Sequence, residues 1–356
     1  MNNIKKIQEK LIEKNLDAVL VTDEKNQRYA TGFPFTDGAV IVARSAAWLI
    51  TDSRYIEAAT NTAACCCNVQ MFDREHSRLS LIQAALKEAG VERLGAEEEK
   101  LSHAEYLGYE KSLGMELLPA QAIFSELRAS KSEEEIGYLR EAQAISEKAL
   151  AEVLRIIKPG MTERQVAAEL VYHMLLNGSE GNSFDPIVIT GKKTSMPHGV
   201  PGDEVIQEGD FVTMDFGCLK HGYCSDMTRT IALGYVSEKM DKVYHTVLEA
   251  QLAGIAATKA GVAGREMDAA ARNVINAAGF EGLFGHSYGH SLGLLIHEGP
   301  YANTRNDKPM PAGAVVSAEP GIYIPDEFGV RIEDVTVITE TGCEILTKSP
   351  KNLIIL

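Results

Sequence analysis

Two aspartates stand close together in a stretch of sequence that has the pattern of a strand, a turn and a second strand. The stretch is MDFGCLKHGYCSDMTRT, residues 214–230, and the aspartates are Asp215 and Asp226. If Lys220 and His221 form the centre of a hairpin, the two carboxylates lie directly opposite each other, with Cβ atoms roughly 4.5 to 5.5 Å apart. Two like charges at that distance repel, but the pair is tolerable if a cation lies between them.

Further candidate ligands follow downstream in the sequence. Together with the two aspartates they would give four carboxylates and at least one imidazole. This is more than a typical structural zinc site holds, since such a site has four ligands rich in Cys and His. They suit two divalent ions, and a set rich in oxygen favours Mn²⁺ over a metal that prefers thiolates. Two metals roughly 3.5 to 4 Å apart acidify water and stabilise a hydrolytic transition state. The downstream candidates are His286, His290, His297, Glu319 and Glu333, with Arg331 two residues before Glu333 on the same face of a strand.

Each of these residues also has an ordinary structural explanation. The aspartates could be turn or capping residues, and Glu319 could be an exposed charge before a Pro-Gly turn. His290 could be a hydrogen-bonded polar residue, and Glu333 could pair with Arg331. Residue types and spacing alone leave both interpretations open.

The first third of the chain alternates strand and helix patterns. Residues 17–22, 38–43 and 46–51 are short apolar runs bounded by turn residues, which is typical of strands. Residues 78–90 have the pattern of a helix that ends at a glycine. This part of the sequence therefore predicts a compact α/β domain.

A second domain is expected after this first one. Ser132 and Glu135 form a capping box, which predicts the start of a long helix. Beyond it, two successive blocks of helical pattern are each followed by strand patterns, which indicates a duplicated α+β layout. We therefore expect an α/β domain over residues 1–127 and an α+β domain over residues 128–356.

Composition excludes several classes of protein. The 356 residues carry a formal net charge of −15, whereas nucleic-acid and anionic-membrane binders need a basic footprint. The sequence has no apolar run of about 18 residues and no signal-peptide pattern, so we expect neither a membrane span nor secretion. Six cysteines without the spacing of a disulfide framework agree with a cytoplasmic location.

Five segments resemble, in order and spacing, the M24 metallopeptidases. This family has the pita-bread fold and includes proline dipeptidase, Xaa-Pro aminopeptidase and methionine aminopeptidase. The amino-terminal domain resembles the creatinase-type domain that methionine aminopeptidases usually lack, through NQRYATGF (26–33) and TDSRY (51–55). The five segments are MPHGVPGD (196–203), MDFG with YCSDMTRT (214–230), HSYGHSLGLLIHEGP (286–300), SAEPGIYIP (317–325) and GVRIEDVTVIT (329–339).

The resemblance implies roles for individual residues. Asp215, Asp226, His290, Glu319 and Glu333 match the ligands of two metal ions, and Glu319 is also the expected proton shuttle. The remaining matches are His198, His286 and His297, which are expected to contact substrate or a developing oxyanion, and Arg331 and Tyr323, which are expected to support the ligands. The chain departs from the family pattern at Ser291, commonly a glycine, and at Gly299, and neither change removes a ligand.

The implied protein has a pita-bread catalytic domain of class α+β, made of duplicated halves, behind a smaller α/β domain. The implied activity is hydrolysis of the Xaa-Pro bond in dipeptides or at peptide N-termini. The implied cofactors are two divalent ions, Mn²⁺ first, with Co²⁺ or Zn²⁺ as alternatives, and the implied assembly is a homodimer without nucleic-acid or membrane partners. A metal-free creatinase-like amidinohydrolase and a non-catalytic peptide-binding module share the fold and remain alternatives, and the sequence does not decide between dipeptidase and aminopeptidase.

Overall fold

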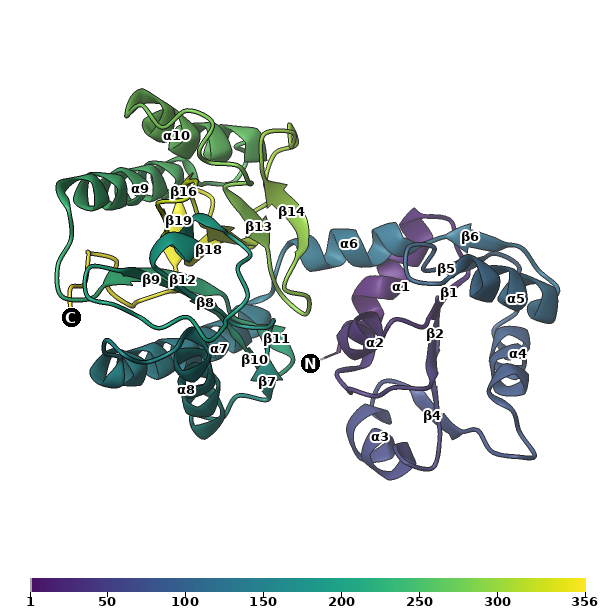
Figure 1. Ribbon diagram of the computed structural model, residues 1–356. Helices are drawn as coiled ribbons and strands as arrows, with labels where there is room; N and C mark the ends of the chain where they lie inside the picture. The colour runs from purple at the N-terminus through teal and green to yellow at the C-terminus, as the bar shows by residue number, and fades with distance from the viewer. Residues whose placement is uncertain (1) are drawn as a thin grey trace. The chain divides into compact units, whose positions relative to one another are not determined.

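The computed structural model describes residues 2–356, and the chain divides into two compact units (Figure 1). The first unit ends at Arg128 and the second is Ala129–Leu356. Each unit has its own hydrophobic core, so each is described by itself.

Within residues 2–356, no helix combines the length and the apolar character that crossing a membrane requires.

The first unit is built on a mixed sheet of six strands in the order β4-β3-β2-β1-β5-β6. Strands β1, β2 and β3 pair antiparallel, whereas β4, β5 and β6 each run parallel to their inner neighbour. The central strands are buried along their whole length, which explains why their sequences are almost continuously apolar. The strands are β1 (Ala18–Val21), β2 (Ala39–Ala43), β3 (Ala47–Thr51), β4 (Asn68–Met71), β5 (Leu94–Ala96) and β6 (Leu117–Pro119).

Helices complete this α/β unit. The amino-terminal helix buries Ile4, Ile7 and Leu11, whereas Ile12 is exposed although it belongs to the same apolar pattern. The α/β architecture expected for the amino-terminal part is confirmed. The helices are α1 (Ile4–Glu13), α2 (Glu24–Thr31), α3 (Ile56–Ala63), α4 (Arg78–Glu88) and α5 (His103–Leu113), and α6 (Gln121–Ala129) reaches the boundary between the units.

The second unit consists of two similar halves, each with a pair of helices followed by antiparallel strands. Figure 1 shows α7 and α8 on one side of the strands and α9 and α10 on the other. The predicted α+β class, with two helix-and-antiparallel-sheet halves, is confirmed. Helix α7 begins after the predicted capping box, in which the Ser132 hydroxyl accepts from the backbone N–H of Glu135 and the Glu135 carboxylate accepts from the backbone N–H of Ser132. The helices are α7 (Glu133–Ile156), α8 (Glu163–Leu176), α9 (Glu238–Ala257) and α10 (Gly264–Ala277).

The strands of the second unit form several small sheets. Those of the first half have the orders β12-β9-β8 and β11-β10-β7, and those of the second half have the orders β14-β13-β15-β18-β19 and β16-β17. The first-half strands are β7 (Gly181–Asn182), β8 (Ile187–Thr190), β9 (Phe211–Phe216), β10 (Cys218–Lys220), β11 (Tyr223–Cys224) and β12 (Met227–Ala232), with a 3₁₀ turn η1 (Gly191–Ser195) after β8. The second-half strands are β13 (Gly289–Ser291), β14 (Glu298–Ala302), β15 (Val315–Ala318), β16 (Gly321–Ile324), β17 (Phe328–Arg331), β18 (Asp334–Ile338) and β19 (Cys343–Ile345).

The expected register of the aspartate hairpin is wrong by two residues, because the centre of the turn lies one residue further along the chain than expected. The turn is centred on His221 and Gly222, which both have positive φ, as a two-residue type I′ turn requires. Glycine adopts this conformation readily, and its position after the histidine moves the centre of the hairpin. Asp215 therefore faces Thr228 rather than Asp226. Because Asp226 lies two residues before Thr228, its side chain belongs to the same face of the hairpin.

Candidate metal centre

The five expected metal ligands all line one cavity of 460 Å³ in the second unit. Two come from the first half of the unit and three from the second half. Each of these residues lies within a strand or directly beside the end of a strand, so the paired strands fix the position of every candidate ligand. Asp215 lies on β9, Asp226 directly before β12, His290 on β13, Glu319 directly after β15, and Glu333 between β17 and β18.

Three of the candidate ligands already have the spacing of a metal site. One donor atom each from Asp226, His290 and Glu333 lie within 4.8 Å of one another. His290 Nε2 is 3.5 Å from Asp226 Oδ2 and 3.2 Å from Glu319 Oε1. One imidazole nitrogen thus contacts carboxylates from two different strands, as a ligand cluster requires.

The hydrogen bonds of the carboxylates show that a cation fits this cavity. Within residues 2–356, neither Asp215 Oδ1 nor Glu333 Oε1 has a hydrogen-bond partner, although both atoms are buried. The second oxygen of each residue is held, since Asp215 Oδ2 accepts from Arg331 and Glu333 Oε2 accepts from Thr228 Oγ1 at 2.7 Å. A buried carboxylate oxygen without a donor is costly, and a metal ion would satisfy both.

The surroundings of His290 leave one ring nitrogen for a ligand bond. Its Nδ1 lies 3.2 Å from the backbone carbonyl oxygen of Ser291. This oxygen can only accept a hydrogen bond, so Nδ1 carries the proton and Nε2 is left with a free lone pair. Burial lowers the pKa of His290, so the ring is neutral near neutral pH. A neutral imidazole whose second N–H is held by a carbonyl is the usual arrangement of a metal-binding histidine.

Burial also shifts the pKa values of the acidic ligands. Burial, followed by repulsion from neighbouring carboxylates, raises the pKa of Asp226 and of Glu333 well above the usual range. Burial raises the pKa of Glu319 to about 7, and Arg331 opposes this change. Carboxyl groups that resist ionisation by themselves are stabilised as carboxylates when a divalent cation binds.

The raised pKa of Glu319 gives a prediction for metal-free protein. A carboxyl group with a pKa of about 7 in the folded state and 4.5 in the ordinary state holds more protons folded than unfolded between these values. It therefore stabilises the fold below pH 4.5, and this contribution is lost as the pH rises through 7. Glu319→Gln, which stays neutral, should gain roughly 3 kcal/mol of unfolding free energy relative to the native chain between pH 4.5 and pH 8.

The measurement is urea denaturation of both chelator-treated proteins at several pH values. Comparing the two proteins cancels the opposing titration of the buried histidines. A difference in unfolding free energy that does not change with pH would contradict the prediction.

A hydrogen-bond network supports the ligands from behind. Arg331 is buried, and its guanidinium donates to Asp215 Oδ2 at 2.5 Å, to Thr228 Oγ1 at 3.0 Å and to the Tyr323 hydroxyl at 3.0 Å. The same Tyr323 oxygen lies 2.8 Å from Nε2 of His286. Arg331 is thus the cation that offsets part of the carboxylate charge.

The three histidines expected outside the ligand set all line the cavity, but their surroundings differ. His286 has both ring nitrogens engaged, one with Tyr323 and the other with the carbonyl of Ser287 at 2.9 Å. Burial, with Arg331 as the next cause, lowers its pKa to about 3, so it is neutral. His198 and His297 are exposed at the cavity surface, and the His297 ring packs edge-on against His290 with 4.3 Å between centroids.

Sequence reasoning missed the residues that form the cavity wall. Most of them are apolar or aromatic, and such a wall is recognised only after the strands are paired. Ile187, for example, lies opposite Asp215 in the pairing of β8 with β9. The missed residues include Phe184, Asp185, Ile187, Ile296 and Tyr301.

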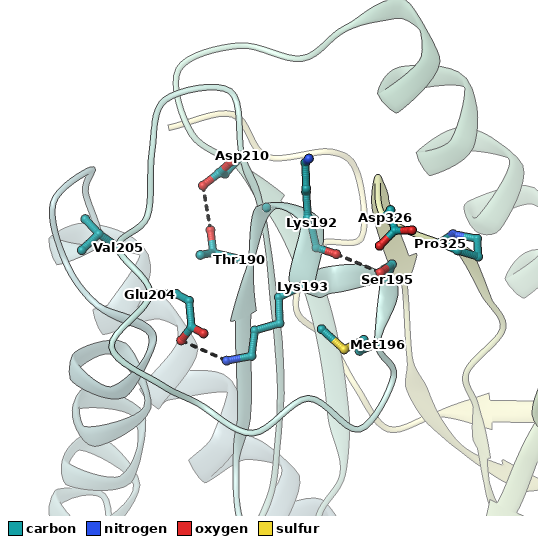
Figure 2. Close-up of a pocket in the computed structure, with 11 residues that line it drawn as sticks. Thr190, Lys192, Lys193, Ser195, Met196, Glu204, Val205, Asp210, Pro325 and Asp326 are labelled. Carbon is teal, nitrogen blue, oxygen red and sulfur yellow. Dashed lines mark hydrogen bonds and ion pairs between the residues drawn. The ribbon is translucent and has the colours of Figure 1, made fainter.

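A second cavity, of 740 Å³, lies beside η1 (Figure 2). Several of its charged and polar groups are partnered with each other, since Lys193 pairs with Glu204 at 3.0 Å and Thr190 donates to Asp210 at 3.1 Å. Met196 lines this cavity, whereas the next residues, Pro197 and His198, line the first one. One short loop therefore separates the two, and the candidate metal-ligand side chains all lie in the smaller cavity.

Comparison with known proteins defines the class. Residues 137–340 match the model of metallopeptidase family M24, and residues 3–130 match the creatinase/prolidase N-terminal domain. The chain belongs to metallopeptidase family M24. The five donor side chains in its cavity agree with the use of metal ions by such an enzyme.

Its relatives carry two functional names. The solved structure of the Xaa-Pro dipeptidase from Bacillus anthracis is 41% identical, covers 99% of both chains and has a TM-score of 0.95. The X-Pro aminopeptidase from Thermotoga maritima is 34% identical, covers 98% of this chain and 99% of that one, and has a TM-score of 0.93. The Xaa-Pro dipeptidase of Pyrococcus horikoshii is 35% identical over 99% of this chain and 98% of its own length.

Proposed function

We propose that the chain is a dinuclear-metal-dependent peptidase that hydrolyses the Xaa-Pro bond of dipeptides or of peptide N-termini. The observation that carries this proposal is the cavity in which five ligand-type side chains meet and two buried carboxylate oxygens lack any donor from the described residues. The substrate class is supported by the names of the full-length relatives. Residues 128–356 would perform the chemistry, and residues 1–127 would form the creatinase-type domain.

The proposed ligands of the two ions are Asp215, Asp226, His290, Glu319 and Glu333. Four carboxylates balance the charge of two divalent ions, and the oxygen-rich donor set favours Mn²⁺, with Co²⁺ or Zn²⁺ as alternatives. When bound, such ions polarise a carbonyl group and lower the pKa of water. The resemblance to two-domain family members further supports a homodimer, and the cysteine pattern and the lack of a signal-peptide pattern support a cytoplasmic location.

The chain's own residues would provide positioning and proton transfer. Glu319 lines the cavity, so a carboxylate oxygen that does not hold a metal could take a proton from water and pass it to the leaving proline nitrogen. His198 and His297 are the exposed donors that would stabilise the oxyanion. His286 would act through Tyr323, because both of its ring nitrogens are already engaged.

The bond before proline explains why a dedicated site is needed. An Xaa-Pro peptide is a tertiary amide without an N–H, so the site must bind it without relying on that donor. The apolar wall of the cavity, which includes Phe184, Ile187 and Ile296, offers space for a ring of this kind. The metal-free amidinohydrolase and the binding module are less favoured, because the chain keeps all five donor side chains in one cavity.

The test uses metal-stripped protein with Mn²⁺ added back. Hydrolysis of a dipeptide Xaa-Pro and of a tripeptide Xaa-Pro-Yaa is measured, and Xaa-Ala peptides serve as controls for the need for proline. We expect Mn²⁺-dependent cleavage of at least one proline substrate. Cleavage of the dipeptide alone defines a dipeptidase, and cleavage of the tripeptide defines an aminopeptidase. Absence of metal-dependent cleavage of either peptide would overturn the proposal.

A further inference from the structure

A buried lysine contacts the two segments that carry His290 and His297. The Lys131 ammonium lies 2.9 Å from Glu298 Oε1 and 3.0 Å from Ser291 Oγ, and its side chain is only 1% exposed. Ser291 directly follows His290, and Glu298 directly follows His297. One ammonium group therefore connects the residue after the candidate ligand with the residue after the histidine that packs against it.

Each of the two groups that contact the ammonium makes a further hydrogen bond. The Ser291 hydroxyl donates to the carbonyl oxygen of Val315 at 2.7 Å, and Glu298 Oε2 accepts from the backbone N–H of Leu295 at 3.3 Å. The loop between them packs directly on the ion pair at Gly293, where a Cβ would lie 2.5 Å from Glu298 Oε1 and 3.2 Å from Lys131 Cε. The segment from 291 to 298 therefore has little room to shift while this contact persists.

Lys131 itself has a fixed position in the chain. Its backbone N–H donates to the carbonyl oxygen of Gly313 at 2.8 Å, and the preceding Ser130 hydroxyl donates to the carbonyl oxygen of Ala312 at 2.6 Å. The next residue, Ser132, caps helix α7. The ammonium therefore extends from a rigid helix start and not from a mobile loop.

We propose that Lys131 is a positioning residue that sets the spacing of His290 and His297 by binding Ser291 and Glu298 behind the cavity. The metal-binding part of this proposal rests on the proposed function, whereas the placement of the two imidazoles does not. A buried ammonium needs a charged partner, so the pair with Glu298 persists. The hydrogen bonds of the ammonium then fix the positions of Ser291 and Glu298, and with them those of the two neighbouring histidines.

The first experiment examines histidine ring signals by NMR in chelator-treated, full-length protein. The rings of His290 and His297 are 4.3 Å apart, so each affects the chemical shifts of the other. Lys131→Met should shift or broaden both signals, while the signals of His103 and His245 stay unchanged. His297→Gln assigns one signal. Lys131→Met/Glu298→Leu removes both charges together and provides a folded variant if the single substitution prevents folding.

The second experiment measures Mn²⁺ affinity by calorimetry, and kcat and KM after metal loading. Loss of Lys131 should weaken Mn²⁺ binding by about 10- to 100-fold, the usual effect of removing a residue that orients a metal ligand. Ser291→Ala, which removes one of the two contacts, should have a smaller effect in the same direction. Leu170→Ala is the control, because it opens a cavity in the core under α8 and lowers stability without touching this loop.

The outcomes separate the two proposals. If the native chain binds none of Mn²⁺, Co²⁺ and Zn²⁺ but the histidine signals move in Lys131→Met, the proposed function fails and the positioning role stands. Unchanged histidine signals and unchanged Mn²⁺ affinity in the Lys131 variants would overturn the positioning role. An equal loss of affinity in Leu170→Ala would also overturn it, because general destabilisation would then explain the effect.

Discussion

Asp226→Asn is expected to lose both metal binding and turnover. Asp226 is 4% exposed, and its carboxylate belongs to the cluster with His290 and Glu333, so a neutral amide removes one of the charges that hold the ions. A metal ion contributes several kcal/mol of transition-state stabilisation, which corresponds to a fall in kcat/KM of about 10³-fold or more. Steady-state hydrolysis of Xaa-Pro peptides and metal analysis of the purified protein provide the measurement.

The fold of this variant should survive. Burial and the neighbouring carboxylates raise the pKa of Asp226, so the native metal-free protein bears the cost of a buried charge that asparagine lacks. Chelator-treated Asp226→Asn should therefore be at least as stable as the chelator-treated native chain at pH 8. Asp307→Asn, an exposed change outside the cavity lining, is the control. Native activity in a metal-free Asp226→Asn preparation would refute the proposed chemistry.

Arg331→Met is expected to cause the largest loss of stability among the site variants. The guanidinium is 4% exposed and pairs with Asp215. Its positive charge lowers the pKa values of Asp226, Glu319 and Glu333, which burial raises. Removing one partner of a buried ion pair costs roughly 3 to 5 kcal/mol, because the other charge stays buried. We expect this loss in metal-free protein at pH 8.

Two further measurements identify the cause of that loss. At pH 5 the carboxyl groups can take up protons, so the deficit should shrink, and saturating Mn²⁺ should also reduce it. Arg140→Met, which breaks an exposed ion pair with Glu344, should cost less than about 1 kcal/mol. A deficit independent of both pH and Mn²⁺ would indicate lost packing instead of uncompensated charge.

The sequence predicted the elements well where local signals agree with tertiary structure. The apolar runs in the first unit form β1, β2 and β3, and the capping box at Ser132 begins α7. Side chains with strong chemical preferences could also be found from their residue types. Nine of the ten residues that were given a role line one cavity, and Tyr323 lies behind it, in contact with Arg331 and His286. Their joint placement came from resemblance, since no local rule relates residue 215 to residue 333.

Details that depend on single backbone positions were harder to predict. The hairpin register was misplaced because Gly222, one residue beyond the assumed centre, decides where positive φ is adopted. The wall residues Phe184 and Tyr301 carry no sequence signal, because cavities arise from the packing of distant strands. The contact of Lys131 with Ser291 and Glu298 spans 160 and 167 positions, so it too appears only in three dimensions.

The division of the ligands between two halves has a consequence for synthesis in the cell. Asp215 and Asp226 are translated well before His290, Glu319 and Glu333, so a nascent chain emerging from the ribosome offers only two of the five donors for much of its elongation. Those first carboxylates have no candidate imidazole ligand until β13 is made. Chains truncated before the second half would therefore lack hydrolytic capacity, and peptide cleavage would begin only when both halves have been translated and have packed together.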